Sequence, residues 1–214
     1  MWLERAARAR SLAERFPASS EALRFYAALA EWQGQAAAAG SSPEDLLPGL
    51  RDLVERAGPP LLRRAARHLT QLPDLEAPPP LSFFARACRQ PLTSPGSCDG
   101  PGLCEGKPQA GCLVTQAEGQ ALELVCALCF GRRSFPRGLC PACRETGRLA
   151  HYSAGGIDHL QVQACESCRR YLLVVDLARD PEALPEVDEL AGLPLDLWAR
   201  QQGYIKIYPN LAGI

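Results

Sequence analysis

Residues 98–168 read CDGPGLCEGKPQAGCLVTQAEGQALELVCALCFGRRSFPRGLCPACRETGRLAHYSAGGIDHLQVQACESC, and this stretch decides the fold. It holds three Cys-x-x-Cys pairs and two earlier cysteines: Cys126/Cys129, Cys140/Cys143, Cys165/Cys168, Cys98 and Cys104. Cys126 follows Cys104 by 22 positions, and Cys165 follows Cys143 by the same 22. The stretch therefore contains one unit used twice, offset by 39 residues: a cysteine turn, an insert of hairpin length and a second cysteine turn.

This spacing is typical of a metal site with four thiolate ligands. Such a site places four sulfurs about 2.3 Å from one ion, and each Cys-x-x-Cys turn supplies two of them. One isolated pair would also fit a redox motif, but a matched and repeated spacing favours metal binding. We predict one or two zinc or iron ions per chain, because four thiolates suit either metal.

The first unit lacks the leading cysteine of its first turn. The 39-residue offset places Cys140 opposite Pro101, and Cys98 is the natural substitute, in a longer turn whose glycines permit positive φ. Cys112 is a second candidate, although the offset places it opposite His151. The predicted metal ligands are Cys98, Cys104, Cys126, Cys129, Cys140, Cys143, Cys165 and Cys168.

Two pairings of the cysteine turns are open. Sequential pairing joins Cys104 to the turn at 126–129, and the turn at 140–143 to the turn at 165–168. Alternatively, the C-x2-C-x10-C-x2-C spacing of residues 126–143 encloses one ion, and the outer cysteines meet outside it. The equal spacing of the two units favours the sequential pairing.

The bulk composition bounds the class of protein. The chain has 214 residues and a net charge of −1, whereas nucleic-acid binders usually carry a basic surplus. All ten cysteines lie between Cys88 and Cys168, unlike a secreted disulfide scaffold, in which cysteines occur throughout a small domain. The first residues contain no apolar signal core, and no run reaches the length of a membrane span. We expect a cytoplasmic protein without membrane insertion, in which Cys88 is a small buried apolar residue.

The hydrophobic pattern predicts an α+β protein. A small N-terminal helical bundle precedes tandem rubredoxin- or zinc-ribbon-like metal-binding units and a short helical C-terminal tail. The expected boundaries are 1–80 for the bundle, 81–139 for the first cysteine unit with a leading helix, 140–175 for the second unit, and 176–214 for an acidic helical tail packing back. In the second unit, strands are expected at 149–152, 160–164 and 171–175.

No catalytic constellation is visible in the sequence. Phosphate-binding glycine loops and Ser-His-Asp or Cys-His arrangements are missing, so we predict a protein that is not an enzyme. His151 and His159 flank the second hairpin, and a position on the strand surface is favoured for both over a role as a stray metal ligand. Arg132, Arg133 and Arg137 cluster on the connection between the units, either as a solvated connector or as a contact for an acidic partner.

These residues resemble the formate dehydrogenase accessory (formation) family of FdhE type. The resemblance covers roughly residues 81–214: the Cys-x-x-Cys runs, the helix at 81–87 before Gln90-Pro91, the segment from Ala164 to Leu172, the segment 180–183, and Leu193 to Ala199. The first site departs from the family pattern, which expects Cys-x-x-Cys where this chain has Pro101 and Cys104. The resemblance implies a cytoplasmic maturation factor that binds the catalytic subunit of a respiratory molybdenum or tungsten formate dehydrogenase.

On this basis the leading hypothesis is a chaperone-like assembly factor with structural or redox-sensing tetrathiolate sites. Two alternatives remain open: a nucleic-acid-binding zinc ribbon, which the charge balance disfavours, and a small rubredoxin-type electron-transfer protein. A homodimer is left open as an oligomeric state.

Overall fold

The structure of the protein is a computed structural model that describes residues 1–93, 96, 104, 106–117 and 119–211. The chain divides into two compact units. The first lies within Met1–Pro95 and includes Leu211, and the second lies within Gly96–Asn210. Among the described residues, no helix has the length and apolarity that crossing a membrane requires.

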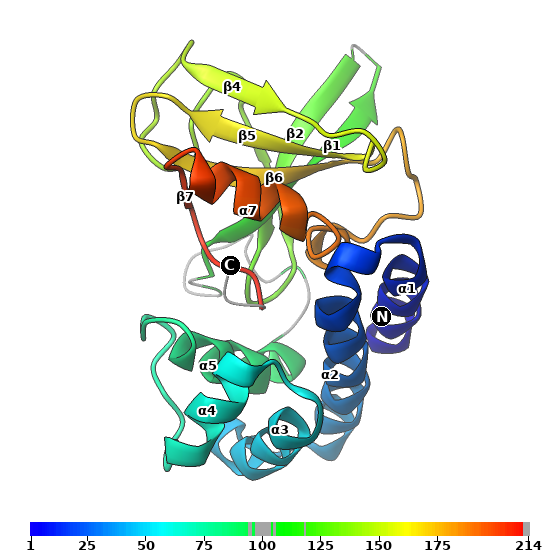
Figure 1. The fold of residues 1–214 in the computed structure, drawn as a ribbon, viewed down its shortest axis with the longest axis vertical. Helices are drawn as coiled ribbons and strands as arrows, with labels where there is room; N and C mark the ends of the chain where they lie inside the picture. Colours follow the sequence, from blue (N-terminus) through cyan, green and yellow to red (C-terminus); the bar gives the residue numbers. More distant parts are fainter. Residues whose placement is uncertain (94–95, 97–103, 105, 118, 212–214) are drawn as a thin grey trace. The chain divides into compact units, whose positions relative to one another are not determined.

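The first unit is helical, as the sequence predicts (Figure 1). Its five α-helices are α1 (Trp2–Arg15), α2 (Ser20–Ala39), α3 (Pro43–Ala57), α4 (Pro60–His68) and α5 (Leu81–Arg89), with short 3-10 turns η1 (Pro17–Ser19) and η2 (Gln90–Leu92). Small residues allow α1 and α2 to pack closely, since Ala6, Ala9 and Ala30 are fully buried. Gly40 ends α2 in the left-handed conformation (φ 65°) that glycine adopts readily. Ser42 and Asp45 form a capping box at the start of α3.

Helix α5 belongs to this helical unit. The rings of Phe25 and Phe83 lie 5.9 Å apart, and Gln33 donates a hydrogen bond to the Ala87 carbonyl over 3.1 Å. Cys88 is fully buried on the same helix, as expected for a small apolar residue. These contacts group α5 with the preceding helices, whereas the sequence boundaries placed residues 81–89 with the first cysteine unit.

The second unit is built on one seven-stranded sheet of order β3-β2-β1-β6-β5-β4, with β7 paired to β6. Its strands are β1 (Pro108–Gln116), β2 (Gly119–Cys126), β3 (Arg132–Phe135), β4 (Leu149–Tyr152), β5 (Leu160–Cys165), β6 (Arg170–Asp176) and β7 (Ile205–Lys206). Strands β1–β3 and β4–β6 are two antiparallel meanders offset by about 39 residues, which is the predicted repeat. They join through parallel pairing of β1 with β6, so that Gly111 lies opposite Val174.

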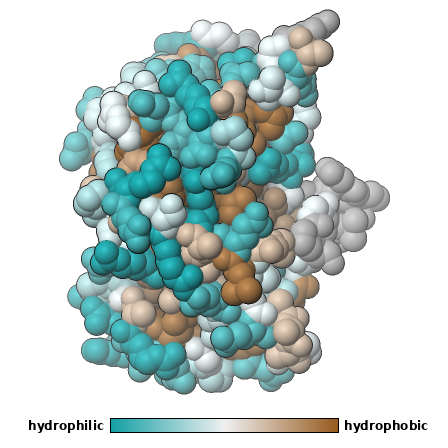
Figure 2. Space-filling view, turned by 90° about the vertical axis from the view of Figure 1, so that its right-hand side faces the viewer, coloured by the Kyte–Doolittle hydropathy of each residue, from teal (hydrophilic) through white to brown (hydrophobic). Residues whose placement is uncertain are grey.

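The two faces of this sheet are covered differently. On one face, an apolar cluster is formed by Leu113, Leu122, Leu124, Leu172 and Val174, and the partly buried Phe135 and Ile207 pack against it. Helix α7 (Leu193–Gln201) lies over β5 and β6, and the short helix α6 (Pro185–Asp188) contacts β1 and β6 (Figure 1). In the view of Figure 2, apolar surface residues are interspersed with hydrophilic ones. The expected α+β architecture is confirmed.

Candidate metal centre

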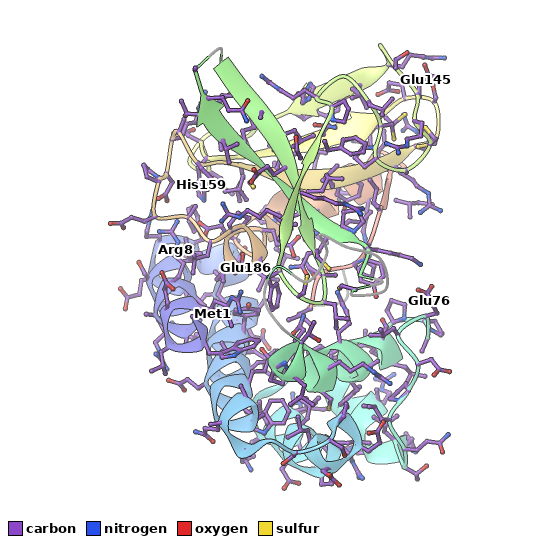
Figure 3. The ribbon with its side chains drawn as sticks, turned by 180° about the vertical axis from the view of Figure 1, so that it is seen from behind. Met1, Arg8, Glu76, Glu145, His159 and Glu186 are labelled. Atoms are coloured by element: carbon purple, nitrogen blue, oxygen red, sulfur yellow. The ribbon has the colours of Figure 1, made fainter. Side chains whose placement is uncertain are left out.

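The second cysteine unit brings four sulfurs together. The Sγ atoms of Cys140, Cys143, Cys165 and Cys168 all lie within 4.8 Å of one another. Glu145, labelled in Figure 3, belongs to the same turn, and its carbonyl accepts a hydrogen bond from the Cys140 N–H. Cys140 and Cys168 are 3.8 Å apart, and Cys143 and Cys165 are 3.7 Å apart. A tetrahedron with metal–sulfur bonds of about 2.3 Å requires about 3.8 Å between sulfurs. The donor set and its spacing therefore fit one zinc or iron ion.

The backbone of each Cys-x-x-Cys turn explains this convergence. The N–H groups of Leu128 and Ala142 donate to the first sulfur of their turns, Cys126 (3.3 Å) and Cys140 (3.4 Å). In all three turns, the residue after the second cysteine adopts positive φ: Phe130 (56°), Arg144 (64°) and Arg169 (56°). This conformation costs a residue with a side chain about 1–2 kcal/mol. It bends the backbone so that N–H groups point at the sulfurs, and thiolates accept such hydrogen bonds well.

The thiols respond to this environment in opposite directions. Partial burial raises the pKa of Cys165, but N–H groups of Cys168 and Ser167 donate to its sulfur, and the net pKa lies below the usual value. Burial raises the pKa of Cys168 to about 12. A cation at the centre of the four sulfurs would favour deprotonation of all of them.

The first cysteine unit brings together three of its sulfurs among the described residues. Cys104, Cys126 and Cys129 lie within 4.8 Å of one another, and the Sγ atoms of Cys104 and Cys126 are 3.4 Å apart. Gly106 is required beside them, since a Cβ at this position would overlap the Cys126 sulfur. Cys98, the predicted fourth ligand, lies outside the described residues. The two groups follow the sequential pairing of cysteine turns and not the alternative within residues 126–143.

Cys112, the second candidate for the fourth ligand, lies apart from this group. It is fully buried on β1, opposite Glu123 on β2, and its sulfur is 4.0 Å from the Glu123 carboxylate. Burial raises its pKa to about 11, although Arg132 acts in the opposite direction. A thiol in this environment stays protonated and does not serve readily as a ligand.

We expect Cys88 and Cys112 to resist alkylation in the native protein at pH 8. Burial raises their pKa values to about 12 and about 11, so that no more than about one thiol in a thousand is ionised. Iodoacetamide treatment after mild chelation, followed by peptide mass spectrometry, should modify Cys143 and leave both buried thiols intact until the protein is denatured. Equal labelling of Cys112 and Cys143 in the folded protein would contradict this.

The structure brings together a third group of side chains of metal-ligand type, of which the sequence indicated only His159, as a stray ligand. His159, Asp180 and Asp188 offer atoms within 4.8 Å of one another, and His159 Nε2 lies 3.1 Å from Asp188 Oδ1. The expectation that His159 lies on the strand surface is wrong, because this residue is only 5% exposed. The segment that buries it follows more than 20 residues later in the chain. Strand periodicity carries no signal for such a contact.

The acidic tail is largely buried and partly compensated. Lys206 Nζ lies 2.9 Å from Asp196 and 3.2 Å from Glu189, and all three side chains are almost completely buried. Tyr171 donates to Asp196 over 2.9 Å. Two carboxylates of the acidic tail therefore meet Lys206, one of only two lysines in the chain, and Asp188 meets His159.

Residues 139–212, which contain the whole second cysteine group, match the family "FdhE, C-terminal domain". Over these residues the chain resembles that domain. The FdhE homolog of Aquifex aeolicus is 28% identical over 114 residues, or 52% of this chain and 40% of that protein. The homolog of Stutzerimonas stutzeri is 36% identical over 112 residues, or 50% of this chain and 36% of that protein. The resemblance read from the sequence is confirmed.

The similarity in fold extends beyond the segment that matches the family. The crystal structure of the FdhE protein from Pseudomonas aeruginosa superposes with a TM-score of 0.71, covers 99% of this chain and 95% of that one, and is 22% identical. At this identity the match shows a shared fold. The matched part of the chain spans about two fifths of the curated FdhE relatives.

Proposed function

We propose that this protein is a maturation factor for a molybdenum or tungsten formate dehydrogenase and that it binds the catalytic subunit of that enzyme. The proposal rests on one observation: a closed group of four cysteine sulfurs lies within the segment that matches the FdhE C-terminal domain. The protein acts in the cytoplasm, where thiols stay reduced and available to metal.

A closed tetrathiolate site supports a role other than catalysis. Four protein ligands fill the coordination sphere of a tetrahedral ion, so that no position remains for a substrate or for an activated water. The ion would link the turn at residues 140–143, which precedes β4, to the turn at residues 165–168, which connects β5 to β6. Zinc would supply structural stability alone, and iron would add one-electron chemistry.

The assignment of formate dehydrogenase as the client, the enzyme that this protein matures, is tested by capture and by gene deletion. The tagged chain is expected to retain the formate dehydrogenase catalytic subunit of the same genome when both are co-expressed. Deletion of the gene should lower formate dehydrogenase activity while the subunit is still synthesised. Full activity in the deletion strain, together with no capture, would refute the proposal.

We expect the purified protein to contain two ions per chain, with Cys98 as the fourth ligand of the first group. Substitution Cys98→Ser should reduce the content from two ions to about one, whereas the matched substitution Cys112→Ser should leave two. Elemental analysis measures the content, and a visible ferric-thiolate band distinguishes iron from zinc. A content of one ion in the unmodified protein would show instead that the first group does not retain metal.

A further inference from the structure

A basic groove lies within the second unit. It has a volume of about 840 Å³ and is lined by Lys107, Pro108, Leu124, Arg133, Ser134, Phe135, Pro136, Pro141, Ala142, Arg144, Arg170 and Ile207. The four charged members of this lining are all cations, and they come from four separate segments. Within the described residues, no carboxylate belongs to the lining.

The sheet register explains why these side chains share one face. On β3, Arg133 pairs with Leu124 and Phe135 pairs with Leu122. Residues at alternate positions of a strand point to the same side, so Arg133 and Phe135 stand on the side of the apolar cluster. Phe135 and Ile207 cover that cluster only partly and form an apolar floor beneath the cations.

The cysteine turns supply the rest of the rim. Arg144 directly follows Cys143 in the left-handed conformation, and its guanidinium lies 5.3 Å from the Phe135 ring centroid. Arg170 lies two residues after Cys168, at the start of β6, and Lys107 precedes β1 beside the first group, where its carbonyl accepts a hydrogen bond from Ala127. All four cations are exposed.

This concentration of positive charge contrasts with the rest of the chain. The protein as a whole carries a net charge of −1, yet four cations converge here. Thiolates that hold a metal carry negative charge, and the arginines beside Cys143 and Cys168 could serve only to balance it. Arg133 does not fit that role, since it lies on β3 and outside any cysteine turn.

We propose that this groove binds an extended acidic segment of a partner protein, in which carboxylates alternate with aliphatic or aromatic side chains. Carboxylates match the arginines through charge-assisted hydrogen bonds. Apolar side chains of the segment match the floor of Leu124, Phe135 and Ile207. A single inorganic anion would fill little of about 840 Å³. A nucleic acid would find few aromatic platforms, because Phe135 is the one ring in the lining that the described residues form.

The identity of the partner rests on the proposed function, which names the catalytic subunit of formate dehydrogenase as the protein that carries the acidic segment. The groove itself is tested without the client. A fluorescein-labelled peptide of twelve residues, with alternating Glu and Leu or Phe, is titrated with the full chain in its metal-loaded form. Fluorescence anisotropy is measured at two salt concentrations. A peptide with Lys in place of Glu and a single-stranded oligonucleotide of equal charge serve as comparison probes.

The decisive variant is Arg133→Glu/Arg170→Glu, and Arg200→Glu, an exposed arginine of α7 outside the groove, is its matched control. The groove variant should bind the acidic peptide at least about tenfold more weakly, while the control binds as the unmodified protein does. Metal content and circular dichroism show that the variants are folded, and Arg133→Gln/Arg170→Gln gives an intermediate loss without charge reversal. Binding should weaken with salt.

Three outcomes would overturn the proposal. They are absence of binding to the acidic peptide, equal affinity of the groove variant and the control, and binding of the oligonucleotide in place of the peptide. A groove variant that loses metal and not peptide affinity would show that the arginines only balance the thiolates. If the peptide binds but the formate dehydrogenase subunit is not captured, the groove is an acidic-peptide site and the proposed partner is wrong.

Discussion

Replacement of Cys165 by serine is expected to remove the ion of the second group and to unfold much of the β-rich unit. Cys165 is buried at the end of β5, and its sulfur lies 3.7 Å from that of Cys143. A structural zinc site contributes about 10–16 kcal/mol of binding free energy, more than the total stability of a typical domain. Three remaining thiols leave the ion with an open position and much lower affinity.

The matched control is Cys112→Ser, which changes a buried cysteine of the same sheet outside both cysteine groups. We expect this variant to keep its metal and to lose only the stability associated with a buried hydroxyl, about 1–3 kcal/mol. Elemental analysis and urea unfolding followed by circular dichroism give both quantities. If Cys165→Ser retains its ion and unfolds at the same urea concentration as the unmodified protein, the second group is not a metal centre.

Lys206→Met is expected to destabilise the second unit by about 3–5 kcal/mol, because it leaves buried carboxylates without their cation. Lys206 Nζ is within 3.2 Å of both Asp196 and Glu189, and the three side chains are withdrawn from water. Urea denaturation measures the loss. Lys107→Met removes the other lysine of the chain, which is exposed, and should change stability by less than about 0.5 kcal/mol.

A double variant separates the charge from the packing of the lysine. Lys206→Met/Asp196→Asn removes one buried negative charge along with the cation, and the introduced amide oxygen can still accept the hydrogen bond that Tyr171 donates to Asp196. We expect this double variant to be more stable than Lys206→Met alone. Similar stability of the two variants would indicate that the lysine acts through its methylene chain and not through its charge.

The contacts of Lys206 also make the stability of the second unit depend on pH. Burial by itself lowers the pKa of Lys206, but the attraction of Asp196 and Glu189 outweighs it, and the pKa lies above the usual value. The stabilisation is therefore complete below about pH 10, the unfolded pKa of lysine, and is lost as the pH rises through the higher folded pKa. This loss of stability at alkaline pH should be absent from the Lys206→Met variant.

Local sequence determined the elements of this protein. Helical periodicity correctly predicted the helical unit, and the capping box of Ser42 and Asp45 and the C-terminal Gly40 of α2 are likewise local signals. The 39-residue cysteine repeat correctly predicted two hairpins, because a Cys-x-x-Cys turn and its hairpin are also local structures. It did not predict β3, which lies where a connection between the units was expected. The positive φ of Arg144 and Arg169 arises in the same turns.

Only the tertiary structure decided how these elements meet. Parallel pairing of β1 with β6 joins strands that lie far apart in the chain, and neither hairpin contains a signal for it. The burial of His159 against Asp188, and of Glu189 and Asp196 around Lys206, depends on the tail packing over the sheet. The groove likewise gathers cations from four segments. Contacts across such distances are chosen by burial and charge in the folded chain, and these are not encoded in the periodicity of any single segment.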